Sequence, residues 1–146
     1  MRILISAYAC EPDRGSEPGV GWNRVLAYQK QGHSISVITR KNNENSINNW
    51  LNDNELENVN FFYYDLPWIF RYLKRATHSI YFYYLIWQIG VYFWAKNNIK
   101  SDEFDFIQHV TFVSVRQPSF LGLLGIPFIF GPVAGGEYIP PALTRS

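Results

Sequence analysis

The chain has 146 residues, of which 47% are hydrophobic and 17% charged, a composition that fits one folded domain and excludes a disordered chain. A net charge of +1 provides no general field for a nucleic-acid backbone, so nucleic acid is excluded as a partner. A single cysteine, Cys10, excludes an internal disulfide and a cysteine-based zinc site, and no signal-peptide pattern precedes the first apolar run, so we expect a cytoplasmic protein without a metal.

The first third of the chain predicts a βαβ unit. Short apolar runs at Arg2 to Ser6 and Ser34 to Thr39 are typical of buried parallel strands. Between them, Trp22, Val25 and Leu26 follow helical spacing, and the helix is expected to end at Gly32. The polar segment that follows, Lys41 to Asn54, contains apolar residues at helical spacing and predicts a short amphipathic helix.

The rest of the chain continues the alternation of strands and helices. Strands are predicted at Val59 to Tyr64, Asp105 to Val110 and Pro127 to Phe130, and helices at about Ile69 to Asn97 and at Val115 to Leu124. This order predicts an α/β fold, a Rossmann-like open parallel sheet with helices on both faces. In such a sheet, ligands bind beyond the carboxyl ends of the strands, where the strand order reverses.

A glycine-rich loop follows the first strand. Gly15, Gly19 and Gly21, together with Val20, are expected to open a helix whose free N–H groups attract a phosphate or another anion. The spacing is neither that of the dinucleotide fingerprint nor that of the P-loop. A ligand loop and an ordinary glycine-rich connection therefore fit the pattern equally well.

Three further positions lie at predicted strand ends. His109 can donate a hydrogen bond to a sugar hydroxyl, or it can be a core histidine bonded to a carbonyl. Arg40 can bind an anion at the same edge, although arginines are more often solvated. After the last strand, Gly135 and Gly136 allow close approach of a ligand and Glu137 adds an acceptor for hydroxyls, unless this segment is only a turn-rich connection.

These segments together resemble the amino-terminal domain of family 4 glycosyltransferases, which are retaining enzymes of the GT-B fold. The resemblance rests on residues 3–8, on the segments Gly15 to Trp22 and Gly32 to Arg40, on His109 with residues 116–118, and on Pro127 to Glu137. The segments Ser-Glu-Pro-Gly-x-Gly-Trp and Gly-Pro-x-x-Gly-Gly-Glu are the more specific ones, and the match extends over nearly the whole chain.

The resemblance implies transfer of a sugar from a nucleotide-diphosphate sugar to an acceptor hydroxyl, without a metal or other cofactor. It implies that Gly19 and Gly21 approach the donor phosphates, that His109 contacts the transferred sugar, and that Gly135 to Glu137 line the cleft. The acceptor, a carbohydrate or a lipid-linked one, would bind mainly to this domain. The domain that binds the donor nucleotide would be a second, carboxy-terminal one that the 146 residues do not contain, so we expect no activity from this chain alone.

The apolar run from Tyr81 to Ala95 is shorter than the roughly 20 residues that cross a bilayer. Arg71, Lys74 and Arg75 precede it, and a basic, aromatic-rich helix can lie at a membrane interface, which here would be the inner face of the cytoplasmic membrane. A helix packed on the sheet, with extra rings closing an acceptor groove, is the commoner use of such a run.

Two other functions fit part of the sequence. One is a non-catalytic module, or a split-gene product, that binds an acceptor and needs a separate donor-binding partner. The other is a nucleotide-binding oxidoreductase or flavodoxin-like domain. The second is disfavoured because the dinucleotide glycine motif is missing and because Arg40, not an acidic residue, ends the second strand.

Overall fold

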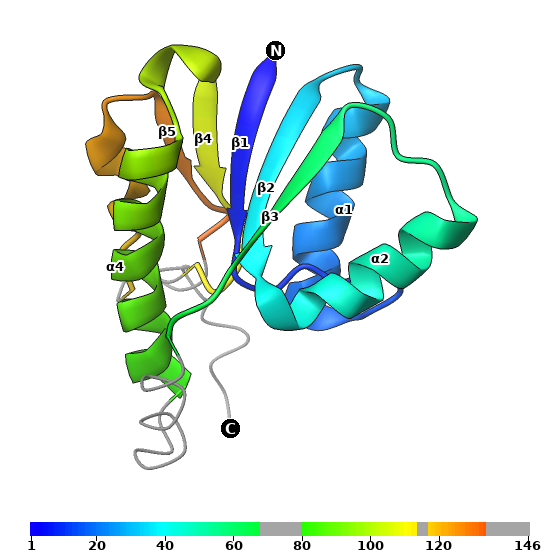
Figure 1. The fold of residues 1–146 in the computed structure, drawn as a ribbon, viewed down its shortest axis with the longest axis horizontal. Coiled ribbons are helices and arrows are strands. Elements are labelled where there is room, and N and C mark those ends of the chain that lie inside the picture. The colour runs from blue at the N-terminus through cyan, green and yellow to red at the C-terminus, as the bar shows by residue number, and fades with distance from the viewer. Residues whose placement is uncertain (68–79, 114–116, 134–146) are drawn as a thin grey trace, which may run out of the picture.

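The computed structural model describes residues 1–67, 80–113 and 117–133. Within them, five strands form one open sheet in the order β3-β2-β1-β4-β5, and every neighbouring pair is parallel (Figure 1). The strands are β1 (Arg2–Ala7), β2 (Ser34–Arg40), β3 (Val59–Tyr64), β4 (Phe106–His109) and β5 (Phe128–Phe130). The predicted Rossmann-like parallel sheet is confirmed, and each predicted strand lies within a residue of the observed one.

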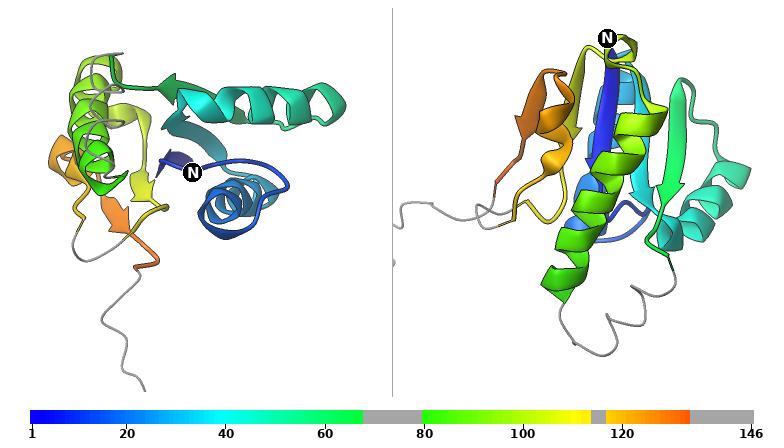
Figure 2. Two further views of the ribbon diagram at one scale, coloured as in Figure 1. Left: turned by 90° about the horizontal axis from the view of Figure 1, so that it is seen from below. Right: turned by 60° about the vertical axis from the view of Figure 1, so that its left-hand side comes forward.

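Three α-helices flank the sheet in the described ranges: α1 (Ser16–Lys30), α2 (Glu44–Asp53) and α4 (Ile80–Asn98). Short 3-10 helices are η1 (Lys41–Asn43), η2 (Ser101–Glu103) and η3 (Phe120–Leu124). Figures 1 and 2 show α1 and α2 on one face of the sheet and α4 with η3 on the other. The expected coverage of both faces is therefore also confirmed.

Side-chain alternation along the strands divides the core into two clusters. Ile3 and Ile5 of β1 point toward α1 and pack with Trp22 and Val25. The residue between them, Leu4, points to the other face and packs against α4. Because successive side chains of a strand face opposite sides, each central strand contributes to both clusters.

Helix α4 packs its buried face on the sheet. Tyr83, Tyr84, Trp87, Val91 and Ala95 are at most 1% exposed, and their three- and four-residue spacing places them along one side of a helix. No helix in the described parts of the chain is long and apolar enough to cross a membrane. The helix predicted for Ile69 to Asn97 is seen from Ile80 to Asn98, and residues 68–79 lie outside the described ranges.

Two predicted helix boundaries are wrong. Within the described part of the segment predicted from Val115 to Leu124, residues 117–119 are not helical and Phe120–Leu124 forms the 3-10 helix η3. Pro118 lacks an N–H group and disfavours helical geometry in the residue before it, which accounts for the late start. The predicted stop is confirmed, because Gly125 caps η3 in the left-handed conformation at φ 75°. The second error, the start of α1, affects the functional site.

Candidate functional site

The sheet reverses its strand order between β1 and β4. From β1 the chain builds outward to β2 and β3 on one side, whereas β4 and β5 lie on the other. This is the point where open α/β sheets bind their ligands, beyond the carboxyl ends of the strands. Ser6 of β1 and His109 of β4 are directly paired here in the sheet register.

Three adjacent strands place a polar residue at their last position facing α4. Each follows a buried aliphatic residue by two positions: Leu4 and Ser6 in β1, Ile38 and Arg40 in β2, Ile107 and His109 in β4. Because side chains alternate along a strand, these polar groups continue the apolar columns that pack under α4. The result is a polar cluster at the carboxyl edge, made of Ser6, Arg40 and His109 together with residues of α4.

His109 is fully buried and hydrogen-bonded through both ring nitrogens. Its Nδ1 lies 3.0 Å from Ser6 Oγ, and its Nε2 lies 2.6 Å from the Tyr84 hydroxyl and 3.2 Å from Gln88 Nε2. The ring also stacks on Phe130 of β5, with 5.7 Å between centroids. The structure thus joins β1, β4, β5 and α4 through one imidazole.

The surroundings of His109 keep it neutral. Burial lowers its pKa to about 3, although a hydrogen bond with the Thr111 backbone acts in the opposite direction. With the Gln88 amide nitrogen facing Nε2, that ring nitrogen is assigned as the acceptor and the proton is assigned to Nδ1, which then donates to Ser6 Oγ. Burial also raises the pKa of Tyr84, which keeps that hydroxyl protonated. At neutral pH His109 is therefore a hydrogen-bonding group without charge.

Three buried polar atoms near this edge have no hydrogen-bond partner among the described residues. They are the Tyr8 hydroxyl, Arg40 Nε and Gln88 Oε1. Tyr8 follows β1, and its ring makes edge contacts with Tyr84 and Trp87, each at 5.1 Å between centroids. Because these three atoms are buried and the Tyr8 hydroxyl interacts with the Arg40 side chain, they are positions for a buried water and not groups that a ligand reaches from outside.

The charge of Arg40 is compensated within the site. Its guanidinium lies 3.6 Å from Asp65 after β3, and both side chains are nearly buried, at 13% and 10% exposure. The guanidinium also covers the rings of Tyr8 and Tyr83, at 4.9 and 5.3 Å from their centroids. Arg40 does lie at the predicted edge, but it is a paired cation and not a free anion ligand.

The glycine-rich loop does not open α1 as expected. The helix begins at Ser16 with Gly15 as its N-cap, so Gly19 and Gly21 lie inside it. A Cβ on Gly19 would collide with the Arg14 carbonyl oxygen, and one on Gly21 with the Ala9 carbonyl oxygen. These two glycines are needed because the loop after β1 folds back onto α1, and their N–H groups are not the free ones that the sequence reading assigned to a phosphate.

The first turn of α1 already contains an anion. Glu17 accepts a 2.9 Å hydrogen bond from the Phe112 N–H in the loop after β4, and Ala9 N–H donates to Thr111 Oγ1 at 3.1 Å. These contacts join the two loops across the switch point. A carboxylate at a helix N-terminus uses the electrostatic potential that would favour a phosphate. Val20 is 43% exposed and lies beside Asn23, Arg24 and Ala27 on the outer side of α1.

The remaining predicted site residues, Gly135, Gly136 and Glu137, lie outside the described residues. Within the described ranges there is no group of three or more His, Cys, Asp or Glu side chains that could hold a metal ion.

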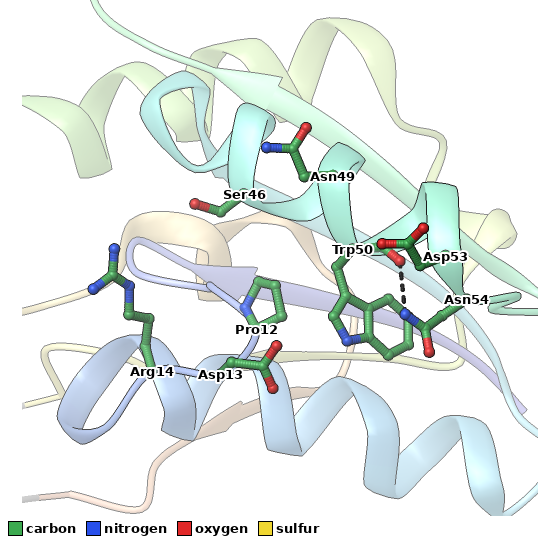
Figure 3. Close-up of a pocket in the computed structure, with 8 residues that line it drawn as sticks. All are labelled: Pro12, Asp13, Arg14, Ser46, Asn49, Trp50, Asp53 and Asn54. Atoms are coloured by element: carbon green, nitrogen blue, oxygen red, sulfur yellow. Dashed lines mark hydrogen bonds between the residues drawn. The ribbon is translucent and has the colours of Figure 1, made fainter.

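A separate groove lies between the loop after β1 and helix α2 (Figure 3). It has a volume of about 530 Å³. Its lining comes from Pro12, Asp13, Arg14, Ser46, Asn49, Trp50, Asp53 and Asn54. The loop is part of the ligand site predicted from the sequence, whereas no role was predicted for α2.

Sequence reasoning missed most partners of His109. Ser6 carried a detectable signal, because a polar residue interrupts the apolar alternation of β1 at its carboxyl end. Tyr84 and Gln88 had little detectable signal in the sequence, because a helix that is apolar on nearly all sides does not reveal which side it buries. Tyr8 and Thr111 lie just after strands β1 and β4, where only the switch-point rule could have indicated them.

Comparison of this chain with known proteins finds no matching family model, no similar curated protein and no similar solved structure.

Proposed function

We propose that this chain forms the acceptor-side half of a retaining GT-B type glycosyltransferase, which transfers a sugar from a nucleotide-diphosphate sugar to an acceptor hydroxyl. The observation that carries the proposal is the neutral polar cluster at the strand switch point. Ser6, Tyr84 and His109 form its hydrogen-bonded centre. The sequence resemblance supplies the reaction class, and the cluster supports a ligand with hydroxyl groups.

The charges at this edge suit hydroxyl groups better than phosphates. His109 is neutral, Arg40 is paired with Asp65, and Glu17 occupies the start of α1. A sugar hydroxyl donates and accepts at once, which suits a neutral polar edge, but it reaches the buried atoms Gln88 Oε1 and Arg40 Nε only if the site rearranges. A phosphate needs uncompensated donors or cations, and these groups offer few.

His109 acts in this proposal as a positioning residue. Both of its nitrogens are already bonded, so direct contact with a transferred sugar would require Tyr84 or Gln88 to turn away. With a pKa near 3 it is also too weakly basic for general base catalysis at neutral pH. Its contribution is to hold the buried side chains of Tyr84 and Gln88 in place and thereby to fix α4 against the carboxyl edge that an acceptor meets.

The donor nucleotide is held chiefly by a second Rossmann-like domain in this proposal. These 146 residues alone are therefore expected to bind an acceptor but to show no turnover with UDP-glucose or GDP-mannose. Addition of a separate donor-binding domain to the chain is expected to restore sugar transfer. The split-gene alternative predicts the same outcome.

The exposed side of α4 supports a contact with a lipid-linked acceptor or a membrane surface. Tyr81, Phe82, Leu85, Ile89 and Phe93 are 37% to 64% exposed. Interfacial helices bury such residues at the headgroup boundary. Sedimentation with phosphatidylglycerol vesicles at low salt tests the membrane contact. A Phe93→Ser substitution should weaken binding to the vesicles. Failure of the protein to sediment at any lipid concentration would contradict the membrane contact but not the proposed transferase.

Calorimetric titration of the chain tests the function itself. The ligands are disaccharides and hexasaccharides of glucose, mannose and N-acetylglucosamine, together with UDP-glucose, NADH and FMN. We expect binding of at least one oligosaccharide series, weakened by Gln88→Leu, and no tight binding of NADH or FMN. Micromolar binding of NADH or FMN without any oligosaccharide binding would overturn the proposal in favour of a nucleotide-binding oxidoreductase domain.

A further inference from the structure

We propose that the groove along α2 is a second carbohydrate subsite, which holds a distal unit of the acceptor chain. This inference rests on the proposed function, because it assumes that the carboxyl edge binds an acceptor. It concerns a different set of residues from the His109 cluster, and these residues lie against the face of the sheet that α1 and α2 cover.

Both walls of the groove start beside the carboxyl edge, because the loop follows β1 and α2 follows β2. Its loop wall, Pro12 to Arg14, belongs to the connection that leaves β1 at the switch point. Ser46, near the start of α2, donates a 3.0 Å hydrogen bond to Glu11 in the loop, and this bond joins the two walls. From Ser46 to Asp53 the helix rises by about 10 Å, so the groove extends away from the edge along α2. A linear acceptor that occupies both sites therefore crosses the carboxyl edge, from the α4 side, where the His109 cluster lies, to the α2 side, where the groove lies.

The lining has the chemistry of a sugar site. Trp50 lies between Asp13 and Asp53, with Asn54 beside it (Figure 3). The indole of Trp50 is half-buried and held by an edge contact with Trp22 at 4.9 Å between centroids, so it is a fixed apolar surface for a sugar ring. Around it the carboxylates accept hydrogen bonds and the amide of Asn49 both donates and accepts.

Several polar groups of the groove are available to a ligand. Asn49, Asp13 and Asp53 are exposed. Asn54 is partly committed, because it donates to the Trp50 carbonyl oxygen at 2.9 Å. Asp13 has φ 55°, a left-handed conformation that aspartate adopts in turns more readily than most residues, and it turns the loop that forms one wall of the groove. The groove has a volume of about 530 Å³ and is open to solvent, so it would cover one side of a sugar unit without enclosing it.

The charges argue for a neutral sugar over a phosphate. Arg14 is the one cation of the lining, and it pairs with Glu11 at 3.8 Å. Asp13 and Asp53 leave the groove negative, which repels anions. A basic peptide would satisfy the carboxylates but would leave the Asn49 amide without a matched partner, whereas the Ser46 hydroxyl already donates to Glu11. A sugar hydroxyl matches all of these groups.

The test compares long and short oligosaccharides in calorimetric titrations. The double variant Asn49→Ala, Asp53→Ala removes two exposed polar groups of the groove, and its matched control, Asn45→Ala, Asn52→Ala, removes two exposed groups of α2 that do not line it. Thermal unfolding verifies that both variants fold. Because all four positions are exposed, we expect both to keep the wild-type stability.

The subsite predicts that the hexasaccharide binds more tightly than the disaccharide. The groove variant should lose about tenfold in hexasaccharide affinity, or about 1.4 kcal/mol, with unchanged disaccharide affinity, and the control should match wild type. Unchanged hexasaccharide affinity in the groove variant overturns the subsite and leaves the proposed function intact. If wild type binds a lysine hexapeptide, the groove variant does not, and the two bind the hexasaccharide equally, the groove is assigned to a basic peptide. Absence of all oligosaccharide binding rejects both proposals.

Discussion

Acidification should destabilise this fold through His109. The unfolded chain binds a proton at the ordinary histidine pKa of about 6.5, whereas burial lowers the pKa in the folded protein to about 3. The unfolded state therefore binds more protons between these values. The stabilisation from the neutral ring is fully present above about pH 6.5 and is lost as the pH falls toward 3.

The size of this effect follows from the proton linkage. Each pH unit below about 6.5 costs about 1.4 kcal/mol, so the loss between about pH 7 and 4.5 is roughly 2.5 kcal/mol. Domains of this size are stable by only about 5–15 kcal/mol, which makes the loss readily measurable. Carboxylates also contribute to acid unfolding, so the comparison must be made with a variant that lacks the ring.

The assay is urea unfolding followed by tryptophan fluorescence at about pH 7 and 4.5. His109→Gln, which keeps hydrogen-bonding capacity without a titrating group, is expected to lose roughly 2.5 kcal/mol less on acidification than wild type. His33→Gln, a half-buried position next to Met1, retains His109 and should keep the wild-type acid sensitivity. An equal loss in His109→Gln and wild type, or a His109 ring NMR signal that titrates near pH 6.5 in the folded protein, would refute the reasoning.

Three further substitutions or reactions test the packing. Gly21→Ala should lower the free energy of unfolding in urea by roughly 1–3 kcal/mol, although alanine favours helices, because its Cβ would collide with the Ala9 carbonyl oxygen. The control Gly15→Ala places its Cβ in open space and should cost under about 1 kcal/mol. A Gly21→Ala variant that is more stable than wild type would contradict the close approach. Burial raises the pKa of Cys10 to about 12, so a thiol reagent such as DTNB at pH 8 should label the chain in urea but not when it is folded. Rapid labelling of the native protein would contradict this burial. Trp87→Ala should lower the free energy of unfolding by about 3–5 kcal/mol, because the indole is fully buried. Phe93 is 56% exposed, so Phe93→Ala should lower it by under about 1 kcal/mol. Similar losses for the two variants would contradict the observed orientation of α4.

The strands were predictable because their local pattern and their tertiary role agree. Val37 and Ile38 are β-branched, lie in a short apolar run and are fully buried on opposite faces of the sheet. The start of α1 was not predictable from the same local signals. Glycines at 19 and 21 resemble a loop, yet they lie inside a helix because the chain folds back to contact them, and Pro18 is tolerated in the first turn.

The candidate site was predictable in position but not in composition. The alternation of strands and helices, together with the switch-point rule, places His109 at the carboxyl edge of the sheet, and it does lie there, paired with Ser6. Its burial and its partners depend on how α4 is rotated about its axis, and a helix with apolar residues on both its buried and exposed sides leaves that rotation undetermined. The pairing of Arg40 with Asp65 likewise depends on the register between β2 and β3, which no local pattern in the sequence reveals.

The most direct test of the central claim is an NMR titration of the isotope-labelled chain with the tightest oligosaccharide from the calorimetric panel. If the carboxyl edge binds acceptor hydroxyls, the largest amide shifts will lie at the ends of β1 and β4 and around Gln88, and UDP-glucose will cause smaller shifts there. Shifts confined to residues far from this edge, or an edge that responds to UDP-glucose and not to any oligosaccharide, would contradict the claim.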